Sequence, residues 1–302
     1  MTKKIQVHEV GPRDGFQSIK CAQIPTEQKI EIIEALLAAG VKHMEFTSFV
    51  SPKAVPQMAD AAEVTKAILE RHPDADLFAL VPNLRGASNA YELGLRKVCY
   101  VVSLSVSHNK ANINRTHEQS LAAFQEIRAA YPDLDIIVDL ATTFGCPFEG
   151  KYNDPAAVVA FLKDYVDAGT TEVCLCDTIG IADPAQVREV IGAIQAAYPE
   201  LKLAVHFHDT RGLGMVNTLT AIDCGVTEIQ STLGGLGGCP FAPGASGNLA
   251  TEDAVWMLNE MGYDTGIRFA DILAAAKREK EIIDGNYSGH HIEIEKETPC
   301  KA

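Results

Sequence analysis

Long apolar runs, paired cysteines and positive charge are all scarce in this chain of 302 residues. No apolar run is longer than a β-strand, which excludes a membrane span and predicts that the protein has no membrane partner. The 8 cysteines form no Cys-x-x-Cys pair, so we expect free thiols and no structural zinc knuckle. The chain has 26 basic and 40 acidic residues, and the resulting net charge of −14 argues against nucleic acid as a partner.

The amino-terminal residues lack a targeting signal. Met1-Thr-Lys-Lys4 leads directly into a strand-like segment, with neither an apolar signal core nor an Arg/Ser-rich transit segment. We therefore expect a cytoplasmic protein. A hydrophobic content of 47% suits a large soluble core, and the length allows one barrel or two smaller domains.

Strand-like and helix-like segments alternate from one end of the chain to the other. Two helices have well-marked starts, because Asp154-Pro155 and Asp183-Pro184 each place an N-cap aspartate before a proline. A helix-ending glycine before a strand recurs at Gly40, Gly94, Gly169 and Gly225. The segments predicted as strands are 5–9, 43–47, 77–81, 97–103, 135–140, 172–176, 202–206 and 228–231. This repeated unit predicts a (β/α)8 TIM barrel, an α/β fold, in preference to an open doubly wound sheet.

The chain continues beyond the eighth predicted strand. A Gly/Pro-rich loop at 234–247 precedes two further helices, near 248–261 and 269–283. We expect residues 1–285 to form a single catalytic TIM-barrel domain that includes these extra C-terminal helices. Residues 286–302 are predicted to form a polar, loosely held tail.

The most informative motif is His206-Phe207-His208-Asp209, at the end of the seventh predicted strand. Side chains at i and i+2 of a strand project from the same face, so His206 and His208 lie side by side. Two such imidazoles are either half of a metal site or a pair of structural histidines, and the motif alone favours neither. Asp209 points the other way and is predicted to orient a histidine from behind.

Reactive residues collect where barrel strands end, which is where such barrels have their active sites. They lie on or after the first, second, sixth, seventh and eighth predicted strands: Arg13, Asp14, Glu45, Thr47, Ser48, Asp177, His206, His208, Cys239 and Asn248. Two imidazoles, the carboxylate of Asp14 and the carboxamide of Asn248 form a mixed nitrogen and oxygen set. Such a set suits Mg²⁺ or Mn²⁺. Cys239 lies among glycines that allow a loop to close over substrate.

Together these motifs resemble those of the hydroxymethylglutaryl-CoA lyase family. The stretch from Gly234-Gly-Leu-Gly-Gly-Cys-Pro240 to Gly247-Asn-Leu-Ala-Thr-Glu-Asp253 is the most specific part. The other matching segments are Val10-Gly-Pro-Arg-Asp-Gly-Phe-Gln17, Glu45-Phe-Thr-Ser-Phe-Val-Ser-Pro-Lys53, Val55-Pro-Gln-Met58, Asp177-Thr-Ile-Gly180 and His206-Phe-His-Asp-Thr210. The looser pattern of Arg-Asp-Gly with His-x-His is shared with other TIM-barrel lyases, Claisen condensing enzymes and carboxyltransferases.

The resemblance implies an enzyme that cleaves 3-hydroxy-3-methylglutaryl-CoA into acetyl-CoA and acetoacetate by a metal-dependent retro-Claisen reaction. It also implies an acyl-CoA substrate, a homodimer, and a place in a pathway such as leucine degradation. The implied metal ligands are Asp14, His206, His208 and Asn248. The implied catalytic residues are Arg13, Glu45, Asp177, His206 and Cys239, and the implied substrate-binding residues are Arg13, Gln17 and Ser48. Glu45 and Asp177 would orient Arg13 and the groups that transfer protons.

Three departures from the family pattern leave the acyl group open. Gly15-Phe-Gln-Ser-Ile19 replaces Gly-Leu-Gln-Asn-Glu, Val106 stands where many relatives carry Glu, and the fifth strand ends in a more polar segment that begins at Asp139. A related 3-hydroxyacyl-CoA substrate is therefore an alternative. A condensing acyltransferase of the citramalate or isopropylmalate synthase kind, a biotin-dependent carboxyltransferase and a non-enzymatic binding protein are further alternatives. A condensing acyltransferase would lack the Gly-Gly-Cys-Pro motif. A biotin-dependent carboxyltransferase needs a lysine on a core strand, and the predicted strand 172–176 contains none.

Overall fold

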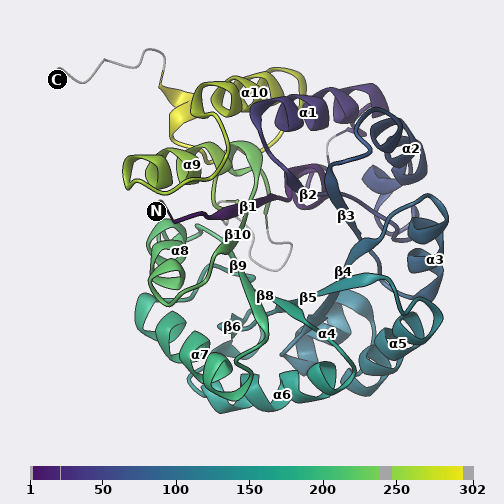
Figure 1. The fold of residues 1–302 in the computed structure, drawn as a ribbon, viewed down its shortest axis with the longest axis vertical. Helices are drawn as coiled ribbons and strands as arrows, with labels where there is room; N and C mark the ends of the chain where they lie inside the picture. The colour runs from purple at the N-terminus through teal and green to yellow at the C-terminus, as the bar shows by residue number, and fades with distance from the viewer. Residues whose placement is uncertain (1–2, 21, 239–246, 295–302) are drawn as a thin grey trace.

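A computed structural model describes residues 3–20, 22–238 and 247–294. Eight parallel strands close into a barrel in the order β1-β10-β9-β8-β5-β4-β3-β2, and helices surround it as an outer ring (Figure 1). The strands are β1 (Gln6–Glu9), β2 (His43–Ser48), β3 (Asp76–Leu80), β4 (Lys97–Ser103), β5 (Asp135–Ala141), β8 (Glu172–Asp177), β9 (Lys202–Phe207) and β10 (Glu228–Ser231). This confirms the predicted TIM barrel, and each strand end lies within one residue of its predicted position.

The helices begin and end where local chemistry requires. Asp154 and Asp183 accept backbone N–H groups in the first turns of their helices, and each helix starts with the predicted proline. Gly40 ends the first helix at φ +105°, a left-handed conformation that favours glycine. The helices that precede the eighth barrel strand are α1 (Thr26–Ala39), α2 (Ala61–Arg71), α3 (Leu84–Glu92), α4 (Val106–Ile113), α5 (His117–Ala130), α6 (Pro155–Asp167), α7 (Pro184–Ala197) and α8 (Gly214–Asp223), of which α4 lies inside the outer ring (Figure 1).

Shorter elements decorate the mouth of the barrel. A π-helical turn, η1 (Gly11–Gly15), follows β1, and a small hairpin of β6 (Gly145–Cys146) and β7 (Gly150–Lys151) follows β5. Two further short turns are η2 (Pro56–Met58) and η3 (Leu233–Gly235). None of the helices within the described ranges is long and apolar enough to cross a membrane.

The barrel interior is filled, so its two ends are separate. A buried plug crosses the middle and is made of Phe78, Cys99, Ile137, Cys174 and Ala204. The main apolar core lies between the strands and the surrounding helices. Polar side chains above the plug face the C-terminal mouth, and those below it face the N-terminal floor.

The extra C-terminal helices are α9 (Thr251–Glu260) and α10 (Phe269–Ile282), which lies beside α1 (Figure 1). The expectation that the tail is loosely held from residue 286 is wrong for residues 287–291, here named the C-terminal strap. Backbone N–H groups of Ser288 and Gly289 donate to the Gly234 carbonyl at 3.1 and 2.9 Å. The Asp253 carboxylate accepts the backbone N–H groups of His290 and His291, and the turn η4 (His291–Glu293) follows. The domain boundary at residue 285 stays a prediction.

Candidate active site

A buried arginine–glutamate pair lies at the mouth of the barrel. The turn η1 presents Arg13, and its Nε and one terminal nitrogen donate to the two oxygens of Glu45 on β2, each at 2.7 Å. Two parallel hydrogen bonds between a planar guanidinium and a carboxylate fix the orientation of both groups. The predicted orienting role of Glu45 toward Arg13 therefore agrees with the geometry.

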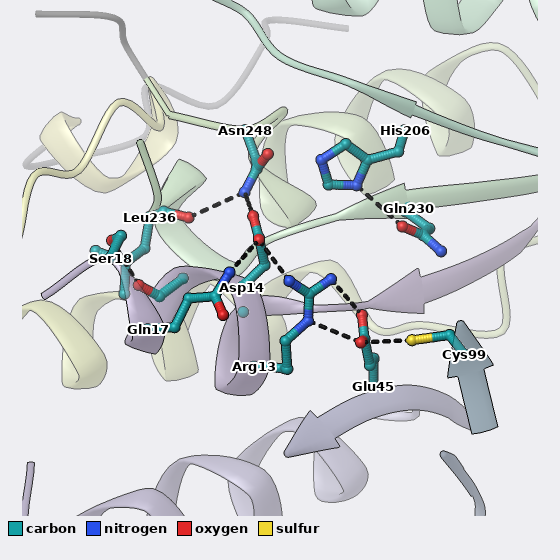
Figure 2. A network of polar contacts seen from close by, with 12 residues as sticks. Arg13, Asp14, Gln17, Ser18, Glu45, Cys99, His206, Gln230, Leu236 and Asn248 are labelled. Carbon is teal, nitrogen blue, oxygen red and sulfur yellow. Dashed lines mark hydrogen bonds and ion pairs between the residues drawn. The ribbon is translucent and has the colours of Figure 1, made fainter. Parts of the chain in front are cut away.

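Asp14 is the centre of the polar network that Figure 2 shows. One oxygen accepts from Arg13 at 2.7 Å and from Gln17 at 3.0 Å, and the other accepts from the Asn248 amide at 2.8 Å. Burial alone would raise the pKa of Asp14, but the charges of Arg13, His206 and His208 lower it to about 2. Asp14 is thus an anion at neutral pH, as a metal ligand must be.

The two predicted histidines lie next to each other and close to Asp14. The ring centroids of His206 and His208 are 5.2 Å apart, and potential ligand atoms of Asp14, His206 and His208 all lie within 4.8 Å of one another. Burial, followed by the neighbouring His206, lowers the pKa of His208 to about 4. This keeps His208 as a neutral imidazole, which is the form that binds metal.

Gln230 orients His206, a role that the sequence reasoning missed. Its side-chain oxygen lies 2.9 Å from Nδ1 of His206. An amide oxygen can only accept, so this arrangement selects the tautomer with the proton on Nδ1 and the lone pair on Nε2. The orienting role expected for Asp209 is wrong, because its Oδ1 accepts the backbone N–H of Gly214 at 2.7 Å. The register of neighbouring strands, which pairs Gln230 with His206, is the signal that identifies the partner.

The donor set fits a divalent cation. Within the described residues, Nδ1 of His208 and Oδ1 of Asn248 are buried and have no hydrogen-bond partner. Such orphaned polar atoms are rare in folded proteins and call for an explanation. The oxygen and the nitrogen of a side-chain amide have nearly the same shape, so the Asn248 amide fits its place in either orientation. Rotation by half a turn places its oxygen, instead of its nitrogen, toward Asp14. The four predicted ligands together provide nitrogen and oxygen donors without a thiolate, as Mg²⁺ and Mn²⁺ prefer.

Three other predicted residues have different surroundings. The carboxylate of Asp177 accepts the backbone N–H groups of Ile181 and Ala182 at 2.9 and 3.0 Å, so it organises the loop after β8 instead of meeting Arg13. Burial raises the pKa of Asp177 to about 6. Ser48 is buried at the end of β2, and its hydroxyl has no hydrogen-bond partner in the described part of the chain. Cys239 lies outside the described residues.

A glycine-rich segment supports the Asn248 amide. Gly237 has φ +150°, and a Cβ added there would lie 2.6 Å from Nδ2 of Asn248. The close approach of backbone to amide therefore requires glycine at this position. The same segment is fixed from outside by the C-terminal strap, through the bonds to the Gly234 carbonyl.

The geometry defines a class of protein before any relative is considered. It is a TIM barrel with a candidate divalent-metal site at its mouth and a cationic group, Arg13, one residue from a ligand. The model of the HMGL-like family matches residues 4–278. The chain belongs to this family of carbon–carbon lyases, as the motifs predicted.

Characterised relatives match over nearly the whole chain. A hydroxymethylglutaryl-CoA lyase of Bacillus subtilis is 43% identical over 277 residues, which are 91% of this chain and 92% of that protein. The mitochondrial hydroxymethylglutaryl-CoA lyase of Homo sapiens is 42% identical over 91% of this chain and 84% of its own length. The structure of an HMG-CoA lyase from Acinetobacter baumannii, in complex with coenzyme A and 3-methylmalate, superposes with a TM-score of 0.91. It is 39% identical and covers 99% of this chain and 97% of its own.

Proposed function

We propose that this protein is a divalent-metal-dependent lyase that cleaves 3-hydroxy-3-methylglutaryl-CoA into acetyl-CoA and acetoacetate. One observation supports this most directly. Asp14 lies within reach of both histidines and also accepts a hydrogen bond from Arg13 at 2.7 Å. A cation and a guanidinium can therefore act on two oxygens of the same small substrate, as a retro-Claisen cleavage requires.

Asp14, His206, His208 and Asn248 would hold the cation, for which Mg²⁺ or Mn²⁺ is our proposal. When bound, such a cation supplies Lewis acidity that lowers the pKa of the substrate's C3 hydroxyl. Gln230 keeps the lone pair of His206 directed at this site. The neutral state of His208 leaves a ring nitrogen available without loss of a proton.

Arg13 stabilises the enolate oxygen that develops on the thioester side when the C–C bond breaks. Its guanidinium is buried, and a fixed cation acts more strongly in such a site than in water. Glu45 holds the guanidinium through two hydrogen bonds, so little reorganisation is needed as the charge forms. The pair thereby supplies stabilisation that is larger in the transition state than in the bound substrate.

Two proton transfers complete the reaction. A base removes the C3 hydroxyl proton as the C–C bond breaks, and we propose that His206 or Cys239 then gives a proton to the acetyl-CoA carbanion. Gln17, which donates to Asp14, and Ser48, whose hydroxyl has no hydrogen-bond partner among the described residues, are proposed to contact the acyl group. Asp177 is proposed to contribute by holding the loop after β8 in place.

The test is a thioester-cleavage assay with identification of both products. We expect acetyl-CoA and acetoacetate, loss of activity with a chelator, and recovery with Mg²⁺ or Mn²⁺. Arg188→Gln, at an exposed position on α7, is the control for variants of Arg13. Cleavage of another 3-hydroxyacyl-CoA but not of the methylglutaryl thioester would contradict the substrate, and activity that withstands the chelator would contradict the metal.

The competing condensation has its own readout. Free CoA thiol formed from an acyl-CoA and a 2-oxoacid, without cleavage of the hydroxyacyl thioester, would assign the protein to the condensing enzymes instead. A homodimer, a cytoplasmic location and a role in leucine degradation belong to the same proposal. Size-exclusion chromatography with light scattering tests the first of these.

A further inference from the structure

Beneath Arg13 lies a second carboxyl group that the proposed reaction does not use. Asp139 on β5 is 3% exposed, and Glu45 is fully buried. Potential ligand atoms of Asp139, Glu45 and Cys99 all lie within 4.8 Å of one another. Figure 2 shows Cys99 approaching Glu45 from the side opposite Arg13.

The charges of this cluster do not balance if every acid is ionised. The Arg13 guanidinium already serves two carboxylates, those of Glu45 and Asp14. Glu45 and Glu172 both oppose an ionised Asp139, whereas Arg13 favours it. The thiols of Cys174 and Cys176 on β8, which also interact electrostatically with Asp139, bring no positive charge. Two carboxylates this close in a buried site cannot both ionise without a large cost.

The direction of the Cys99 hydrogen bond favours Asp139 as the acid that carries the proton. The Cys99 thiol donates to Oε1 of Glu45 at 2.8 Å. A thiol has one hydrogen, so Cys99 has none left for Asp139, which lies in the same cluster and whose Oδ1 has no hydrogen-bond partner in the described part of the chain. A proton on Asp139 supplies the missing hydrogen, and the chain then runs from Asp139 to the sulfur of Cys99 and from the thiol to Glu45. Glu45 keeps its negative charge for Arg13.

We propose that Asp139 is a positioning residue, a neutral carboxylic acid that acts through Cys99 to hold Glu45 ionised and aligned beneath Arg13. The inference rests on the proposed function, because it assigns Arg13 to the reacting enolate. Asp139 itself touches neither the substrate nor the metal ligands in this scheme. Its contribution is to keep the guanidinium where the transition state needs it.

The surroundings of Asp139 give this role a pH dependence. Burial and then the negative charge of Glu45 raise the pKa of Asp139 to about 8. Below this pH the acid is neutral and the hydrogen-bond chain is complete. Above it a second negative charge faces Glu45 and competes for Arg13, so we expect activity to fall as the pH rises through about 8.

The kinetic test compares Asp139→Asn with Asp139→Val. The amide keeps the shape and a donor for Cys99 but cannot ionise, so kcat should stay within about twofold and the alkaline decline should move to higher pH. Valine removes the donor, so kcat should fall about tenfold while KM changes little. Equal losses in both variants, or an unchanged alkaline decline in Asp139→Asn, would overturn the proposal.

A measurement without substrate separates this inference from the proposed function. In protein labelled with ¹³C at the aspartate side-chain carboxyl, NMR should show one resonance that titrates near pH 8, distinct from Asp177 near pH 6. Asp139→Asn should remove that resonance. If every aspartate of the wild-type protein is ionised by pH 7, the inference fails, whatever thioester the enzyme cleaves.

Discussion

The mouth and the floor of the barrel carry similar residues but have different surroundings. Each has a histidine–carboxylate cluster with ligand atoms within 4.8 Å of one another: Asp14, His206 and His208 at the mouth, and His8, Glu172 and Glu228 at the floor. The floor contains its own cation, since Lys97 lies 3.7 Å from Glu172 and 3.8 Å from Asp76. At the mouth, Arg13 donates to Asp14 at 2.7 Å as well as to Glu45, and the Asn248 amide adds a further polar group beside Asp14.

This difference shows what makes a cluster a candidate metal site. His8 is fully buried, and burial followed by the charge of Lys97 lowers its pKa to about 3. A basic side chain lies beside a carboxylate at both ends, so the presence of a cation does not distinguish the two clusters. Histidine and carboxylate composition does not separate the two ends, whereas the Asn248 amide beside Asp14, at the C-terminal end of the barrel, does.

The largest expected effect is a loss of kcat when Arg13 at the mouth is replaced, in contrast to replacement of Lys97 at the floor. Arg13→Gln should lower kcat by about 10²- to 10³-fold, because the developing enolate loses its fixed positive charge. Lys97→Gln should leave kcat within about threefold but lower the free energy of unfolding by about 2 kcal/mol, because Glu172 and Asp76 lose their cation. Steady-state kinetics and urea unfolding of both variants provide the measurements. A Lys97→Gln enzyme as impaired in kcat as Arg13→Gln would show that the two ends are not separate.

A smaller effect is expected for the glutamines beside the histidines. Gln230→Leu removes the acceptor for Nδ1 of His206 and should weaken Mn²⁺ binding about 10- to 100-fold. Gln6→Leu removes the equivalent contact to His8 at the floor and should leave Mn²⁺ affinity unchanged. Titration calorimetry compares the two variants. Equal Mn²⁺ affinities for Gln230→Leu and wild type would contradict the assigned orienting role.

A third effect concerns the backbone that supports the mouth. Gly237→Ala should displace the Asn248 amide and lower metal affinity and kcat about tenfold, since the added Cβ would lie 2.6 Å from Nδ2. Gly262→Ala is the control, because Gly262 has a positive φ of +81° but open space around it. It should cost about 1 kcal/mol of stability without loss of activity. Similar kcat values for the two alanine variants would show that Asn248 does not depend on this contact.

The smallest effect belongs to the floor and depends on pH. Burial raises the pKa of Glu172 to about 7, so the folded state holds this proton more tightly than the unfolded chain. That stabilisation is full below the unfolded pKa of about 4.5 and is lost as the pH rises through about 7. Glu172→Gln should therefore gain about 1–2 kcal/mol relative to wild type between pH 4.5 and pH 8. Parallel stability curves for the two proteins over this range would contradict the assigned pKa.

Strand positions and the residues at strand ends could be predicted from the sequence, because hydrophobic period and helix caps are local. All eight strands were placed in this way, and Asp14, His206, His208 and Asn248 lie at one end of the barrel. The partners of these residues could not be predicted. Gln230 meets His206 only through the register of β9 and β10, which depends on how the whole barrel closes.

Turns and long-range packing account for further differences between the structure and the sequence-based predictions. Asp177 ends β8 and Asp209 follows β9, yet the tight turns that come next direct backbone N–H groups at their carboxylates. Cys99 and Asp139 lie on separate strands, and their contact with Glu45 depends on the stagger around the barrel. The polar composition of the C-terminal strap suggested weak attachment, but its amide groups bind Asp253 and Gly234.

The C-terminal strap also sets an order of events during synthesis. Residues 287–291 leave the ribosome after every barrel strand and after all four proposed metal ligands. Until they emerge, the Gly234 carbonyl and the Asp253 carboxylate lack the amide groups that hold them. A nascent chain can thus close its barrel before the Gly234 carbonyl has its hydrogen bonds to the C-terminal strap. A segment made after all four proposed ligands thus completes the hydrogen bonds to Gly234 and Asp253, and translation products that end before residue 287 lack these bonds.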